Sequence, residues 1–224
     1  GNIVMKAGKS MSQTGGSLNF VSGASDAGLS GSIAFQIGKG NLGGNIVIDT
    51  GDSSEKESGD INLSTGASTT KTGSINIVAK PTAGEGGAVT IEAGHSSSST
   101  GGAVVMHSGS GFPGGQIRVN TGKSLTGTSG SISIATGQAS AGNSGQILIQ
   151  SGNSLGGASG AVSIKAGDSA ISGGDLNVQA GAGNSNNGGS VLIKSGASSL
   201  SGSGNIEIQS PISGDGLSGS IELS

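Results

Sequence analysis

The sequence predicts an all-β fold, a β-solenoid in which one chain stacks short strands along an axis. The first observation is a short alternation of the type Ile-x-Ile, which recurs along the whole chain. A period of two is typical of a strand with one buried face. The second is composition, because Gly makes up 48 of the 224 residues and, with Ser, fills the stretches between alternations. The third is that no window shows the 3.6-residue apolar spacing of a helix, so no significant helix is expected.

The first aliphatic residue of each alternation marks one of 16 repeat units. These residues lie at positions 3, 18, 33, 46, 61, 75, 89, 104, 117, 132, 147, 162, 176, 191, 206 and 221. The consensus is I-x-I-x-[STA]-G-x-S-x-x-G-x-[SG]-G-[SNQDA], and its length varies only in the Gly/Ser half. A fixed short period indicates a repeat architecture. We therefore predict a single repeat domain over residues 1–224.

Within each unit the two aliphatic residues are expected to face the core, and the residue between them to face outward. Ile134 and Ile149 are then buried, and Ser133 is exposed. Gly is expected to supply positive φ at the corners, and Ser to hydrogen-bond its own turn. An antiparallel meander of the same strands is the alternative fold.

Two positions of the repeat, the one before the first aliphatic residue and the one after the second, differ between odd-numbered and even-numbered units. This difference predicts two units per coil, and hence eight coils. Directly after the second aliphatic residue, amides occur only in odd-numbered units: Gln36, Asn120, Gln150, Gln179 and Gln209. A coil of two units would set one aliphatic sheet against another. We therefore expect Asn120, Gln150, Gln179 and Gln209 to stack as an outward amide ladder.

Both ends of the chain stop within the repeat. Residues 1–3 enter the first alternation at once, and residues 221–224 end inside the last. An uncapped coil exposes unpaired backbone that another strand can join. We therefore expect a segment of a longer array, or subunits that stack end to end.

Charge and composition bear on the partners. The net charge of −3 provides no basic patch for nucleic acid. No stretch approaches 18 apolar residues, so no membrane insertion is expected. The predicted partner is the chain itself.

Three short motifs imitate functional sites. Residues 8–10 and 122–124 read Gly-Lys-Ser, as at the end of a phosphate-binding loop, and residues 152–156 fit the G-x-S-x-G of a nucleophile elbow. All three are the G-x-S of the repeat. No catalytic, cofactor-binding or metal-binding residues are predicted, and no enzyme activity.

Two surface features stay open. Asp52, Glu55, Glu57 and Asp60 form an acidic cluster that could hold calcium, but a solvated charged turn is the preferred interpretation because the calcium repeat does not recur. Asn62 begins a glycosylation sequon.

The repeat consensus resembles the Gly/Ser-rich β-solenoid repeats of large extracellular and surface proteins, such as fibre shafts and adhesin stalks. The resemblance covers the whole chain and implies a structural rod or filament segment at the cell surface or outside the cell. The alternative function is an ice-binding or glycan-adhesive module. A regular outward Thr row is absent, which disfavours ice binding.

Overall fold

A computed structural model describes residues 1–211, 214 and 216–223. These residues contain no helix and no β-strand. The predicted all-β solenoid is therefore wrong, and so are its two-unit coil and its eight stacked coils. Ser224, the last residue of the sixteenth repeat, lies outside the described residues.

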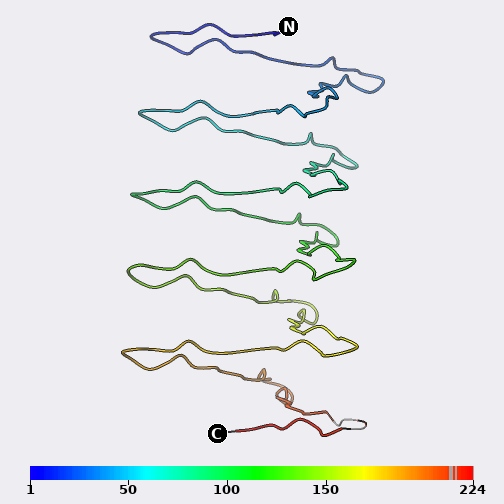
Figure 1. Ribbon diagram of the computed structural model, residues 1–224, viewed down its shortest axis with the longest axis vertical. Coiled ribbons are helices and arrows are strands. Elements are labelled where there is room, and N and C mark those ends of the chain that lie inside the picture. The colour runs from blue at the N-terminus through cyan, green and yellow to red at the C-terminus, as the bar shows by residue number, and fades with distance from the viewer. Residues whose placement is uncertain (212–213, 215, 224) are drawn as a thin grey trace. The chain divides into compact units, whose positions relative to one another are not determined.

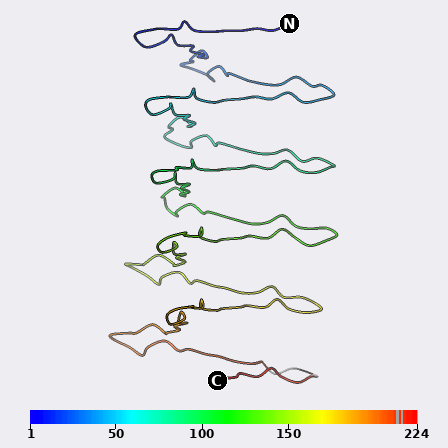
Figure 2. The same cartoon turned by 60° about the vertical axis from the view of Figure 1, so that its left-hand side comes forward.

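The chain divides into two units, Gly1–Ser108 and Gly109–Ser224. Within each unit the chain runs outward, bends and returns, once per repeat, and we call each such excursion an arm (Figures 1 and 2). The bends lie at residues 11–13, 26–28, 41–42, 54–56, 69–70, 83–84, 97–99, 112–113, 125–127, 140–142, 155–157, 170–171, 184–186 and 199–201. Each arm is therefore built from the Gly/Ser half of one repeat.

A backbone hydrogen bond between two glycines closes the base of many arms. In the first unit the N–H of Gly16 donates to the carbonyl oxygen of Gly8 at 2.9 Å. The same bond joins Gly204 to Gly196 in the second unit, also at 2.9 Å. The consensus Gly residues on the two sides of an arm are thus brought together in space.

The small residue directly before the glycine that accepts this bond, such as Ala7 before Gly8, also lies at the base of the arm. A Cβ on Gly16 would lie 3.1 Å from the nitrogen of Gly8 and 3.2 Å from the Cβ of Ala7. In the second unit a Cβ on Gly189 would lie 3.4 Å from the Cβ of Ala180. The residues at the Ser/Thr/Ala position and at the Gly position of the consensus are therefore small because they pack against each other.

A serine closes the bend of most arms, as predicted from the repeat. The backbone N–H of the residue three positions on donates to its hydroxyl oxygen, for example from Gly28 to Ser25 at 3.0 Å and from Ser99 to Ser96 at 2.9 Å. The expectation that Gly supplies positive φ at the corners is wrong for all but one described glycine. Gly142, with φ of 91°, is the exception.

The arms return to the same direction after three repeats, not two. In the first unit the bends at 11–13, 54–56 and 97–99, coloured dark blue, cyan and green, lie one below another at the left of Figure 1. Each of these bends is three repeats from the next along the sequence. A complete coil therefore takes three repeats in this unit.

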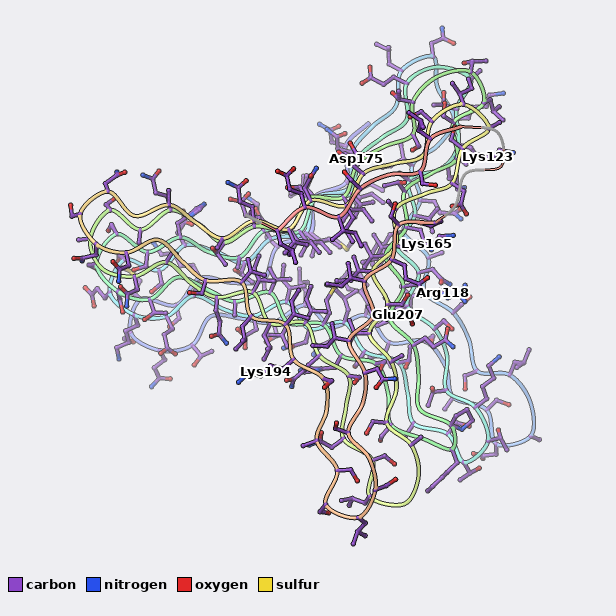
Figure 3. The ribbon with its side chains drawn as sticks, turned by 90° about the horizontal axis from the view of Figure 1, so that it is seen from below. Arg118, Lys123, Lys165, Asp175, Lys194 and Glu207 are labelled. Carbon is purple, nitrogen blue, oxygen red and sulfur yellow. The ribbon has the colours of Figure 1, made fainter. Side chains whose placement is uncertain are left out.

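The labelled residues of the second unit show the same order. Arg118, Lys165 and Glu207, from repeats 9, 12 and 15, lie between the same two arm directions when the chain is seen from below (Figure 3). We call each such position between two arm directions a corner of the coil. Asp175 from repeat 13 and Lys194 from repeat 14 lie at two other corners. Consecutive repeats thus occupy three corners, and the fourth returns to the first.

Hydrogen bonding explains why this arrangement is not a solenoid. Stacked coils of a solenoid are joined by backbone hydrogen bonds at a strand spacing of about 4.8 Å. Among the described residues, every backbone–backbone hydrogen bond joins two glycines of one arm. The arms that are closed in this way bond within themselves, and no backbone hydrogen bond between neighbouring coils occurs among the described residues.

The predicted aliphatic core is also absent from the single chain. No hydrophobic residue in the described part of the chain is buried. Ile134 and Ile149, predicted to be buried, are 73% and 68% exposed. What the sequence marks as a core is an open surface in one copy of the chain.

Candidate functional site

The open surface is built from the two apolar residues of each repeat, which we call the apolar pair. The pair lies between the base of one arm and the base of the next. In the pair Ile132 and Ile134, the first residue is 54% exposed and the second 73%. The same gradient holds for Ile147 and Ile149, at 53% and 68%. In these two pairs the second residue therefore carries more of the uncovered apolar surface than the first.

One contact shows how these second residues are oriented. Phe20 and Phe35 are the second residues of repeats 2 and 3, and their ring centroids lie 6.4 Å apart with an interplanar angle of 84°. This edge-to-face geometry is the preferred one for aromatic pairs. Repeats 2 and 3 thus turn the second residues of their apolar pairs toward each other.

The four predicted ladder amides are exposed and make no hydrogen bond to one another in the described structure. The side-chain amide of Gln209 instead donates to a carboxylate oxygen of Glu207. Asn120 and Gln209 belong to repeats 9 and 15, which share a corner, whereas Gln179 belongs to repeat 13, which lies at another. A row joining all four stays a prediction.

Charged side chains pair locally rather than across coils. Lys165 Nζ lies 2.7 Å from Asp168 Oδ2, and His95 Nε2 lies 2.9 Å from Glu92 Oε1. Each pair spans three residues at the start of one arm, and all four side chains are largely exposed. Such surface pairs contribute little to stability.

The acidic cluster at Asp52–Asp60 does not gather into a metal site in this structure. Nowhere in the described ranges do three or more His, Cys, Asp or Glu side chains come together as a possible metal-binding group. The hydroxyl of Ser53 instead accepts a hydrogen bond from the backbone N–H of Lys56 at 3.1 Å. This segment is built as an ordinary arm bend.

The three motifs that imitate functional sites are arm bends as well. The backbone N–H of Gln13 donates to Ser10 at 3.0 Å, that of Gly127 to Ser124 at 2.9 Å, and that of Gly157 to Ser154 at 3.0 Å. Each serine therefore has the structural role of closing its bend. This outcome agrees with the interpretation of all three motifs as the G-x-S of the repeat.

Sequence reasoning missed a pattern at the tips of the arms. In Gly109–Ser224, large apolar residues occupy the tips of two consecutive arms, and the tip of the third arm is polar. The apolar tip residues, all almost fully exposed, are Phe112, Leu125, Leu155, Ile171, Leu200 and Leu217. The polar tips lie at 140–142 and 184–186. This period of three repeats matches the coil and could have been found in the sequence.

No pocket occurs among the residues that the structure covers. The same residues include no helix that is long and apolar enough to cross a membrane. No protein-family model, curated protein or solved structure matches this chain. The open apolar surface is therefore the feature from which a function must be argued.

Proposed function

We propose that this chain is a structural segment of an extracellular or cell-surface fibre and has no enzymatic role. The observation that carries the proposal is the repeated set of apolar pairs, which is open in each of the two units. A repeated apolar surface of this kind has the form of an assembly surface rather than of a site for one small ligand. Such a surface is suited to holding elongated protein chains together in a fibre.

The construction of the arms supports the proposal. Many arms are closed by hydrogen bonds between residues of their own repeat, such as Gly31 N–H to Gly23 C=O at 2.9 Å. Repeats that depend only on local bonds and nearest neighbours can be added without limit, as in other repeat proteins. Length is then a property that the sequence can set by repeat number, which suits a spacer or shaft.

Electron microscopy of the purified protein tests the proposal. We expect elongated particles of uniform width, whose length decreases in proportion when three repeats, residues 132–175, are deleted. The deletion removes one complete coil and keeps the order of corners. Round particles, or a particle length that does not follow the number of repeats, would contradict the proposal.

A further inference from the structure

We propose that three copies of this chain wind around one axis, so that each copy covers the apolar pairs of the other two. This inference rests on the proposed function and names the partner in the fibre. It requires pairing between different chains, and so differs from a solenoid, in which one chain pairs with itself. Four observations support it.

The first observation is the amount of exposed surface. The chain has an accessible surface of 22,703 Å². A compact monomer of its mass, 21.0 kDa, would expose about 9,000 Å². The difference of about 14,000 Å² is many times the roughly 800 Å² that a typical partner covers on each side. A partner docked at one place cannot cover it, so the partner must follow the chain along its length.

The second observation is the backbone. In the part of the chain that the structure describes, the backbone–backbone hydrogen bonds involve only the glycines at the bases of arms. The N–H and C=O groups of the apolar pairs have no such bond. Covering them with a partner that offers no backbone would leave buried polar groups unsatisfied, which is costly. The partner must therefore present an extended backbone of its own.

The third observation is the spacing of the apolar pairs, which is 13 to 15 residues and irregular in detail. The two shortest steps, of 13 residues each, run from Ile33 to Ile46 and from Val104 to Ile117. An unrelated chain would have to reproduce this sequence of steps to keep its apolar residues in register. A second copy of the same chain reproduces it without further requirement.

The fourth observation is the three-repeat coil, which sets the number of copies. Repeats 12, 13 and 14 lie at three corners, marked by Lys165, Asp175 and Lys194 (Figure 3). A copy turned by one corner places its repeat 12 at the corner that holds repeat 13 of the first copy, so that apolar pairs of different copies meet at every corner. Three such turns return to the starting corner, so the closed and symmetric arrangement contains three chains.

Native mass measurement tests the number of chains. We expect one species of about 63 kDa, three times 21.0 kDa, at micromolar concentration. Coexpression of a tagged and an untagged chain should then give four species with zero to three tags. A folded monomer, or three mixed species as a dimer gives, would overturn the inference.

Paired variants test the surface. Ile134→Asp places a charge in the apolar pair and should abolish the three-chain species, whereas Ser133→Asp, one position away and predicted to face outward, should retain it. Leu155→Asp, at an arm tip, should retain it too and shows that a new charge alone is harmless. Equal masses for Ile134→Asp and the two controls would overturn the inference.

The outcome is separable from that of the proposed function. Elongated particles that contain two chains would refute the three-chain winding and leave the fibre proposal standing. Three-chain particles that are round in the microscope would do the reverse.

Discussion

The most direct quantitative test of an assembled apolar row is the removal of one methylene from it by Ile134→Val. Ile134 is 73% exposed in the single chain, so most of its side chain becomes buried only on association. A buried Ile→Val change costs about 0.5–1.5 kcal/mol per site. Because each assembly of three chains contains three such sites, the total is about 1.5–4.5 kcal/mol. This corresponds to a roughly 10- to 2,000-fold weaker association constant.

The assay is the concentration dependence of thermal unfolding, followed by circular dichroism over a 100-fold range of chain concentration. We expect the unfolding midpoint of wild type to rise with concentration, as for any assembly that dissociates on unfolding. Ile134→Val should lower the midpoint at every concentration, and Ser133→Ala should leave it nearly unchanged. An unchanged midpoint for Ile134→Val, or an equal loss for both variants, would refute the reasoning.

Three further predictions concern the arms. Gly102→Ala should lower the unfolding midpoint, because the new Cβ would lie 3.1 Å from the nitrogen of Gly94 and 3.3 Å from the Cβ of Ala93; Gly94→Ala, whose Cβ would meet nothing within 4 Å, is the matched control and should be tolerated. Ser124→Ala removes the acceptor of the 2.9 Å bond from Gly127 N–H and should speed hydrogen exchange at that amide, while exchange at the bends of other arms stays the same. Leu155→Ser, at a fully exposed arm tip, should leave stability unchanged and reduce binding of a hydrophobic dye, and a large loss of stability would mean that this tip is covered.

The sequence allowed a correct prediction for the half of the repeat whose bonds are local. The serine of G-x-S closes its own bend, as Ser25 and Ser96 do, and a bond over three residues leaves its signature within one repeat. The same locality explains the serines of the two Gly-Lys-Ser motifs, which close their bends as the serines of other repeats do. Their serines are engaged by Gln13 and Gly127 within the same bend.

The sequence could not predict the fold correctly because an Ile-x-Ile alternation specifies a face and not the molecule that covers it. Ile134 and Ile149 have the pattern of a core, yet no hydrophobic residue among those the structure describes is buried in one chain. The size of the coil was missed for a different reason. The alternation of amides such as Gln150 and Gln179 suggested two repeats, whereas the pattern of two apolar arm tips and one polar tip recurs every three repeats.

The positions where the repeat changes length show that its two halves have different structural roles. From Val104 to Ile117 the repeat is 13 residues long, and from Val191 to Ile206 it is 15. The short arm is closed by Gly115 N–H to Gly109 C=O at 2.9 Å, and the long arm by Gly204 N–H to Gly196 C=O at the same 2.9 Å.

Two residues are therefore removed from the excursion of the arm, and the glycine closure at its base is unchanged. The first residues of the flanking apolar pairs, Ile117 and Ile206, are likewise exposed to almost the same degree, 56% and 52%. An arm can vary because it is completed within its own repeat and points away from the apolar row. The apolar pairs cannot vary in this way, because each pair must meet an apolar pair of another chain. Deletions should accordingly be tolerated in the arms and not between the two residues of an apolar pair.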